Sequence, residues 1–347
     1  MGQQQNHKLS CRGWVVLLTA LLLAPTAAFG QPGSSSPSFA GKNVSIIVGF
    51  GTGGGYDLWA RTLARHIGRH LPGQPTVVTQ NMAGAGSFNA ANHLYTVAPR
   101  DGSVFGIIAR DAVIAPLTDQ KGVRFDATKF SWVGTPTLET NVCVAYHTAG
   151  VQSFADLLQR ELIVGATGVS SGSGIYPRAL NALLGTRFRL ITGFASSANV
   201  FLAMERGELD GSCDSLDSFM SRRPDWFTSR KATMIFQGGT EADPHLKDVP
   251  FVLDLARTEE QRQAIRFLYA GQGFGRPFLA PPDVPAERLR ALRDAFDTTM
   301  RDREFVDDVR RQKLDLAPKN GEELAALARS IYATPRPIVD KISELTR

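Results

Sequence analysis

The stretch IIVGFGTGGGYDLWARTL, residues 46 to 63, decides how the chain begins to fold. Apolar residues that favour strands, Ile46, Ile47 and Val48, run into a glycine-rich loop, and an amphipathic segment follows. Over residues 57 to 71 the apolar side chains recur at helical spacing, with arginines on the opposite face. Asp57 lies in the first turn, where the helix dipole favours an acid. The stretch therefore predicts a strand, a tight turn and a helix.

The glycines of this loop match a dinucleotide-binding pattern, but the sequence beyond them does not. Gly49, Gly51 and Gly54 have the spacing G-x-G-x-x-G. A dinucleotide site also needs an acid at the end of the second strand to hold the ribose hydroxyl. Here the second strand, PTVVT, ends in Gln80 and Asn81. A nucleotide is therefore not expected, and the sequence predicts no cofactor.

A second glycine-rich loop, NMAGAGS, follows this second strand at residues 81 to 87. Both loops are predicted to lie at the carboxyl edge of one parallel sheet, each at the start of a helix. Helix N-termini present free N–H groups and partial positive charge, and glycine allows the backbone to approach a ligand closely. The two loops together predict a pincer for a small anion, although each could also be a plain tight turn.

The alternation of strands and helices predicts two lobes. A first α/β unit begins at residue 43, the pattern restarts after residue 138, and the chain becomes helical past residue 280. Terminal helices of a two-lobed protein commonly return to the first lobe. We therefore expect lobe 1 to comprise residues 40–137 and 268–347, and lobe 2 residues 138–267. The cleft between them is the expected ligand site.

The N-terminus has the features of a secretory signal peptide. Lys8 and Arg12 precede a short apolar run, and Ala28-Phe29-Gly30 offers a cleavage pattern. Residues 1–30 are thus predicted to be removed, residues 31–39 to form a linker, and the mature chain to be periplasmic. An N-terminal membrane anchor is the alternative. Without Lys8 and Arg12 the net charge falls from +5 to +3, which is too small and scattered for a nucleic-acid-binding protein.

Four motifs in order resemble the Bug or TctC family, the periplasmic receptors of tripartite tricarboxylate transporters. VGFGTGGGYD is similar to V-P-F-P-P-G-G-G-T-D, and QNMAGAGS to E-N-R-P-G-A-G-G. APRDGSVFGI and FASSANVFLAMERGELDGSCD resemble the two later motifs of the family. The resemblance runs from about residue 40 to the C-terminus. It implies an α/β, two-lobed periplasmic-binding-protein fold of type II (Venus-flytrap), with a small organic carboxylate held between the lobes. It also implies membrane permease subunits as partners, and we expect a monomer.

The resemblance also implies the ligand-binding residues. In loop one, defined as residues 51–57, these are Gly51, Thr52, Gly53, Gly54, Gly55, Tyr56 and Asp57. In loop two, residues 83–86, they are Ala83, Gly84, Ala85 and Gly86. The second lobe would add Ser170, Ser171, Ser173, Ser196, Ser197, Ala198 and Asp214. Phe194 and Ala195 replace the family's Tyr-Lys pair, so the pocket should lack one cation and one phenol hydroxyl, and citrate cannot be assumed.

The sequence also contains patterns that are typical of other functions. Ser170 lies in a G-x-S-x-G pattern and could form a hydrolase triad with His245 and Asp210 or Asp214, but no helix follows the serine at once. A sensory receptor on the same fold is a further alternative. His66 and His70 have metal-ligand spacing, yet they lie on an arginine-rich helix face, and no metal is expected. Cys143 and Cys213 could pair or remain free thiols.

Overall fold

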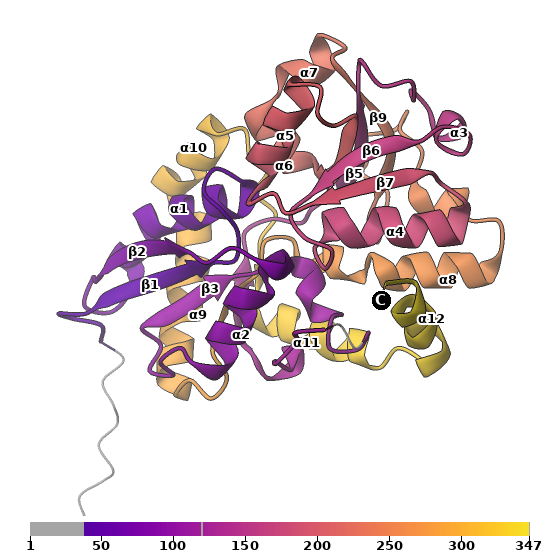
Figure 1. The fold of residues 1–347 in the computed structure, drawn as a ribbon. Helices are drawn as coiled ribbons and strands as arrows, with labels where there is room; N and C mark the ends of the chain where they lie inside the picture. The colour runs from indigo at the N-terminus through magenta and orange to yellow at the C-terminus, as the bar shows by residue number, and fades with distance from the viewer. Residues whose placement is uncertain (1–37, 119–120, 347) are drawn as a thin grey trace, which may run out of the picture. The chain divides into compact units, whose positions relative to one another are not determined.

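The computed structural model describes residues 38–118 and 121–346. The predicted signal peptide and most of the predicted linker therefore lie outside the described residues. Two separate sheets form within the described chain, each covered by helices, so the predicted α/β architecture with two lobes is confirmed (Figure 1). Among the described residues no helix is both long enough and apolar enough to cross a membrane.

The first sheet has six strands in the order β11-β4-β10-β3-β1-β2. β1 (Asn43–Val48) runs parallel to β2 (Thr76–Asn81) and β3 (Val104–Ile107). β10 (Phe278–Ala280) is antiparallel to both β3 and β4 (Ser131–Thr135), and β11 (Lys319–Asn320) pairs antiparallel with β4. The sheet is thus mixed, and its parallel half is the part that the alternating sequence pattern predicts.

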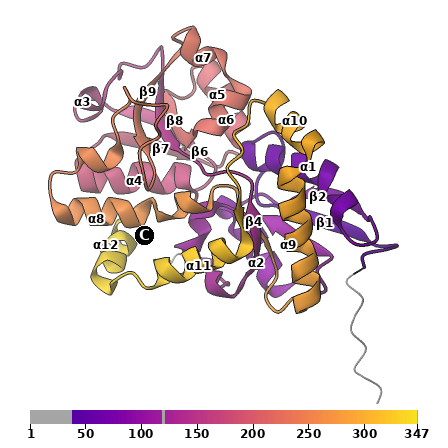
Figure 2. The same cartoon turned by 180° about the vertical axis from the view of Figure 1, so that it is seen from behind.

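Helices from both ends of the chain cover this first sheet. α1 (Gly55–Ile67) and α2 (Phe88–Thr96) follow β1 and β2. Short 3-10 turns lie between the strands at Gly68–His70, Ala85–Ser87, Arg110–Val113 and Ala127–Lys129. α9 (Ala286–Arg301) and α11 (Gly321–Tyr332) contact β4, and α10 (Arg303–Arg311) packs beside α1 (Figure 2).

The second sheet has five strands in the order β7-β6-β8-β5-β9. β6 (Leu162–Ala166) is parallel to β7 (Phe188–Thr192) and β8 (Gly211–Ser215). β5 (Asn141–Tyr146) is antiparallel to β8 and to β9 (Ala232–Gly238). The helices of this lobe are α3 (Phe154–Leu157), α4 (Gly172–Leu184), α5 (Ser197–Glu205), α6 (Leu216–Arg222), α7 (Asp225–Thr228) and α8 (Glu259–Leu268).

The chain passes between the sheets more than once. Residues 136–140 lead from β4 to β5, and after α8 the chain returns to β10 through a 3-10 turn at Ala270–Phe274, with another at Val252–Leu255 before α8. The last helix, α12 (Arg336–Thr346), packs against α4 and α8 (Figure 1). This third passage, back to the second lobe, is one that the sequence prediction did not include.

The buried core is continuous across the two lobes. One apolar cluster runs from Phe88 and Leu94 of α2 to Ile175 and Leu180 of α4. Two further clusters lie on the outer faces, one under α1 and α9 and one under α5 and α6. Because apolar burial is the main stabilising contribution in folding, the shared cluster joins the lobes by packing as well as by the connecting segments.

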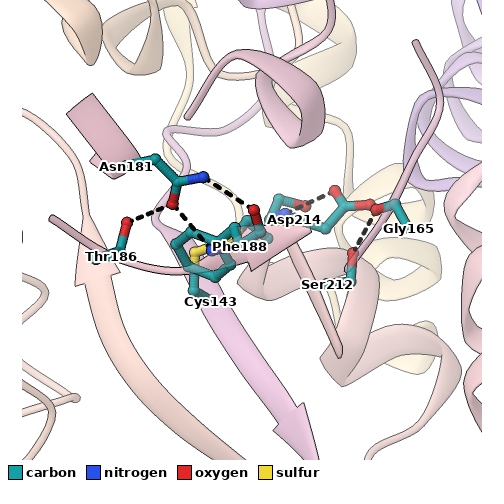
Figure 3. Close-up of a disulfide and its surroundings, with 9 residues drawn as sticks. Cys143, Gly165, Asn181, Thr186, Phe188, Ser212 and Asp214 are labelled. Atoms are coloured by element: carbon teal, nitrogen blue, oxygen red, sulfur yellow. Dashed lines mark hydrogen bonds between the residues drawn. A yellow bond between two sulfur atoms is a disulfide. The ribbon is translucent and has the colours of Figure 1, made fainter. Parts of the chain in front are cut away.

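Cys143 and Cys213 form a disulfide, which settles the alternative that the sequence left open. They lie directly opposite each other in the antiparallel pair β5–β8. Figure 3 shows Cys143 among the hydrogen-bonded groups of Asn181, Thr186 and Phe188, with Ser212 and Asp214 on the neighbouring strand. The disulfide therefore ties the two strands whose ends carry Asn141 and Asp214.

Candidate functional site

A cavity lies where the helix-bearing edges of the two sheets meet. Its volume, measured for the centre of a water-sized sphere, is about 30 Å³. The first lobe contributes Gly54, Gly55, Tyr56, Arg110, Asp111 and Arg276 to its lining. The second lobe contributes Asn141, Ser196, Ser197 and Asp214, with further hydroxyls from Thr167, Ser171, Ser173 and Ser218.

Two helix N-termini, one from each lobe, point their first residues at this cavity. α1 begins after Gly54 and α5 begins after Ser196, and neither N-cap residue caps its helix with a side chain. Uncapped first turns present free N–H groups and partial positive charge. The two ends therefore form an anion-binding pair, made of α1 and α5.

The lobes are in direct contact around this pair. The Gly51 N–H donates to the Ala195 carbonyl at 2.7 Å, and the Ser196 hydroxyl donates to the Thr52 carbonyl at 3.4 Å. A Cβ atom built on Gly54 would lie 3.1 Å from the Cβ of Ser196, tighter than most real contacts. The absence of a side chain at Gly54 thus lets the two helix ends approach each other.

The predicted site residues divide into those on the cavity and those beside it. Gly54, Gly55, Tyr56, Ser171, Ser173, Ser196, Ser197 and Asp214 are lining residues. Gly51, Thr52, Gly53, Asp57, Ser170 and Ala198 are not, and neither are Ala83, Gly84, Ala85 and Gly86 of loop two. At the cavity, loop one therefore meets the start of α5, and residues 83–86 of loop two do not line it.

Loop two instead packs against the start of α4. A Cβ atom on Gly86 would lie 2.6 Å from the Ser171 nitrogen, and one on Gly168 would lie 2.6 Å from the Gly86 nitrogen. Gly86 also has a positive φ of 63°, a conformation that glycine adopts without strain. The glycines of loop two thus allow a close contact between backbones of the two lobes.

Asp57 holds loop one in shape from outside the cavity. Its carboxylate accepts hydrogen bonds from the Gly53 N–H at 2.9 Å, from Arg61 at 3.0 Å and from the Asn81 amide at 2.8 Å. Burial alone would raise the pKa of Asp57, but these hydrogen bonds outweigh it and hold the pKa below its ordinary value. Asn81 also donates to the Phe50 carbonyl. Asn81, which stands near the position where a dinucleotide site has an acid, thus helps to fix the shape of loop one.

Replacing Asp57 by asparagine should lower the free energy of unfolding at pH 7 by about 1.5–3 kcal/mol, because a buried charged hydrogen-bond acceptor is lost. The folded-state pKa is depressed, so this stabilisation is complete above about pH 4 and disappears as the pH falls through the folded pKa. Urea denaturation at pH 7 and pH 3 measures it. The exposed Asp340→Asn variant is the control, and a difference between Asp57→Asn and wild type that stays constant with pH would contradict the assignment.

The arginines of the cavity were missed by the sequence analysis. Arg110 follows β3, and Arg276 precedes β10; both are buried and both pair with the buried Glu139 carboxylate. Arg276 also donates to the hydroxyls of Ser215 and Ser218 in the second lobe. The expected loss of a cation from the pocket is therefore offset by two guanidinium groups. The position of Arg110 at the carboxyl end of a third parallel strand was an available signal.

Aromatic side chains hold these cations in place. The Arg276 guanidinium lies 4.2 Å from the centre of the Tyr56 ring, which stacks in turn on Phe50 at 4.4 Å. The Tyr56 hydroxyl accepts from the Arg110 backbone N–H at 3.1 Å. A cation over an aromatic face is favoured, more so when both are away from water. Tyr56 thereby links loop one to both arginines.

A second acid in the cavity, Asp111, reaches across to the other lobe. Its carboxylate accepts a hydrogen bond from the Tyr176 hydroxyl and another from the Gly172 N–H at the start of α4. Gln272 donates to the same tyrosine hydroxyl, and Tyr176 stacks on Tyr269 at 4.1 Å. The N-terminus of α4 therefore already holds a protein carboxylate, which leaves α1 and α5 as the ends open to a ligand.

The buried charges shift each other's pKa values. Burial alone would lower the pKa of Arg110, but the Glu139 carboxylate outweighs it and the pKa lies well above its ordinary value. Burial raises the pKa of Asp111, Glu139 and Asp214, opposed by the arginines. Burial and the nearby Glu139 raise the pKa of Asp217, which accepts from the Trp59 ring across the lobes, to about 7. Shifts of this kind are concentrated at functional sites.

The residues of the alternative hydrolase do not form a triad. No hydrogen bond joins Ser170 to His245 or to either aspartate in the described part of the chain; Asp210 instead accepts from the Ile163 N–H. The His245 N–H donates to the Asp243 carboxylate in an exposed loop. His66 contacts Asp308 of α10, and His70 contacts Asp302, which caps the N-terminus of α10, so neither histidine lies free on the surface.

No protein-family model and no curated protein matches the sequence of this chain. Solved structures do match its fold. BugD, a periplasmic binding protein, aligns with a TM-score of 0.67 at 19% identity, over 87% of this chain and 96% of BugD. MatC from Rhodopseudomonas palustris, solved with malate, gives 0.67 at 19%, over 88% and 99%. A second R. palustris protein, solved with adipate, gives 0.68 at 17%, over 88% and 98%.

BugD and a TctC solute-binding protein from Polaromonas, which aligns with a TM-score of 0.57 at 17% identity over 88% of this chain and all of that protein, carry the names of the family that the sequence motifs resemble. The TM-scores of 0.67 to 0.68 show a shared fold, although the sequence identities are below 20%. The predicted periplasmic-binding-protein fold, with two α/β lobes, is thereby confirmed. Ligand sites occur preferentially between domains, and this cavity lies between the two lobes.

Proposed function

We propose that this chain is an extracytoplasmic solute-binding protein of the Bug/TctC family, without enzymatic activity. It captures a small organic carboxylate in the periplasm and delivers it to the permease subunits of a tripartite tricarboxylate-type transporter. It enters the periplasm through the signal peptide at residues 1–30 and works as a monomer. The two lobes separate to admit the ligand and close around it.

One observation carries this proposal: two uncapped helix N-termini meet at a buried cavity that also contains two guanidinium groups. The ends of α1 and α5 come from different lobes, so an anion between them contacts both. A ligand that binds only when both ends are present favours the closed arrangement. The carboxylates bound by MatC and by the adipate-bound neighbour support the choice of anion.

A thermal-shift screen of the chain from residue 31 onward tests the proposal. The panel contains mono-, di- and tricarboxylates together with uncharged amides of the same skeletons. At a concentration 100 times Kd, a bound carboxylate should stabilise the protein by about 2.7 kcal/mol, which is roughly 5 °C for a chain of this size. If no carboxylate raises the melting temperature, the proposed function is wrong. Loss of a shift with the matching amide confirms that the charge is recognised.

Replacing Gly55 by alanine should weaken carboxylate binding at least about tenfold, which corresponds to a loss of 1.4 kcal/mol of binding free energy. A Cβ atom there would lie 2.5 Å from the Arg276 Nη2 and 2.7 Å from the Ser218 Oγ, so it intrudes between the lobes at the cavity. Alanine favours the helix, so the fold should persist. Isothermal titration measures the affinity. In Gly150→Ala, the new Cβ meets only Arg160, at 3.5 Å, and binding should be unchanged.

A further inference from the structure

We propose that the contact between α1 and α10 is a binding site for a divalent transition-metal ion such as Zn²⁺, with His66, Asp302 and Glu304 as its protein ligands. The two helices lie side by side in the first lobe (Figure 1). None of the three residues lines the cavity between the lobes. The site is therefore separate from the proposed function and does not depend on it.

The three ligand residues come from opposite sides of this contact. His66 lies in the last turn of α1, Asp302 is the N-cap residue of α10, and Glu304 lies in the first turn of α10. One nitrogen or oxygen atom of each lies within 4.8 Å of those of the other two. Zinc is bound by imidazole nitrogens and carboxylate oxygens, and a water molecule commonly takes the fourth position beside three protein ligands.

The hydrogen bonds of His66 show which of its ring nitrogens can bind a metal. Its Nδ1 lies 2.6 Å from the Arg69 Nη2, and its Nε2 lies 2.9 Å from the Asp308 carboxylate. A guanidinium can only donate, so Nδ1 accepts from Arg69 and the ring proton is on Nε2, which donates to Asp308. The Nδ1 lone pair is therefore already directed at a cation.

The Arg69 guanidinium stands where the three ligand residues converge. It contacts the His66 Nδ1, the Asp302 carboxylate at 3.3 Å and the Glu304 carboxylate. Two carboxylates thus share one positive charge, whereas a divalent cation would match both. The Arg69 side chain is 37% exposed, and ion pairs in contact with solvent contribute little. A metal ion can therefore displace the guanidinium into water and take its position.

Neighbouring residues hold two of these ligands in orientation. Asp308 binds the far nitrogen of the His66 ring, and the His70 Nε2 lies 2.8 Å from the Asp302 carboxylate. The His66 ring also packs edge-on against the buried Phe305, with the ring centres 5.6 Å apart. A histidine that binds a metal ordinarily has a carboxylate on its other nitrogen, and such outer partners strengthen metal binding. The two histidines thus supply one metal ligand and one positioning residue.

Isothermal titration with zinc chloride tests the proposal on the untagged chain from residue 31, at pH 7.5 in a buffer that does not bind metals. One zinc ion should bind per chain. At 100 times Kd, zinc should also raise the melting temperature by about 5 °C, through mass action. Magnesium and calcium prefer sites with more oxygen ligands and should leave the melting temperature unchanged at the same concentration. If zinc does not bind, the proposal is wrong.

Replacing Arg69 by alanine distinguishes this site from a chance surface histidine. The variant removes the competing cation and keeps every ligand, so zinc should bind about three- to tenfold more tightly than to wild type. Arg100→Ala is the matched control, because Arg100 also pairs with an acid and its side chain is 50% exposed; zinc affinity should not change there. If Arg69→Ala binds zinc no more tightly than wild type, Arg69 does not occupy the metal position and the proposal fails.

Removing a ligand should have the opposite effect. Glu304→Gln and His66→Asn should each weaken zinc binding about tenfold or more, since even the loss of an outer partner has an effect of that size. The Glu304 side chain is 73% exposed, so that variant should fold as wild type does, which circular dichroism checks. Glu322→Gln is the control, because Glu322 is 84% exposed and also pairs with an arginine. If Glu304→Gln binds zinc as tightly as wild type, the ion is bound elsewhere and the assignment is wrong.

Discussion

Replacing Glu139 by glutamine should lower the free energy of unfolding by about 3–5 kcal/mol, the largest effect that we expect of a single substitution in this chain. The Glu139 carboxylate lies between the guanidinium groups of Arg110 and Arg276, and all three side chains are buried. Glutamine preserves the shape but removes the charge. The two arginines would then be neighbouring buried cations whose shared counter-ion is missing.

The position of Glu139 adds to this effect. It lies in residues 136–140, the first connection between the lobes, while Arg276 lies on the second, directly before β10. The Arg276 guanidinium continues to Ser215 and Ser218 of the second lobe. The carboxylate therefore ties the two connections together at the cavity. We expect Glu139→Gln to weaken ligand binding as well as stability, because Arg276 lines the cavity.

A matched control separates burial from charge. Glu260 pairs with Lys341 at 3.0 Å, but its side chain is 75% exposed. Glu260→Gln removes the same charge from a solvated pair and should change stability by at most about 1 kcal/mol. Equilibrium urea denaturation at pH 7 compares the two variants with wild type. If Glu139→Gln lies within 1 kcal/mol of wild type, the buried triad does not contribute as an ionised unit.

The features that the sequence predicted well are those set by neighbouring residues. Apolar runs, glycine loops and helix periodicity act over a few positions, so β1, loop one and α1 follow from residues 46 to 63 directly. The structure ends α1 at Ile67 and continues as a short 3-10 turn, where the periodicity suggested one helix to residue 71. Even here only the boundary differs, since the apolar face is the same.

The parts of the site that the sequence did not predict depend on contacts between distant segments. Arg110 and Glu139 are 29 positions apart, and Arg276 comes from a third segment of the chain. No local pattern marks a buried arginine, because its burial is tolerated only once its counter-ion is in place. Loop two likewise looked like loop one in sequence. Its place against Gly168 and Ser171 follows from how the lobes meet, which no strand or helix pattern encodes.

Removing the disulfide should lower the free energy of unfolding by about 4 kcal/mol. Cys143 and Cys213 are 70 positions apart, and the chain-entropy estimate for a loop of that length is about 4 kcal/mol at 25 °C. Both residues are buried in the centre of the β5–β8 pair. Without the cross-link, the unfolded chain has more conformational freedom. The disulfide therefore stabilises the fold mainly by raising the free energy of the unfolded state.

Urea denaturation of two proteins, each with and without dithiothreitol, measures this contribution. In the chain from residue 31, Cys143 and Cys213 are the only cysteines, so reductant acts on one bond alone. Wild type should lose about 4 kcal/mol on reduction, whereas the double variant Cys143→Ala/Cys213→Ala should be insensitive to it. A wild-type midpoint that reductant leaves unchanged would mean that the thiols are not paired. Since Asn141 and Asp214 adjoin the two cysteines, reduction should also weaken ligand binding, and a loss of stability without a loss of affinity would show that the cavity holds its form without the cross-link.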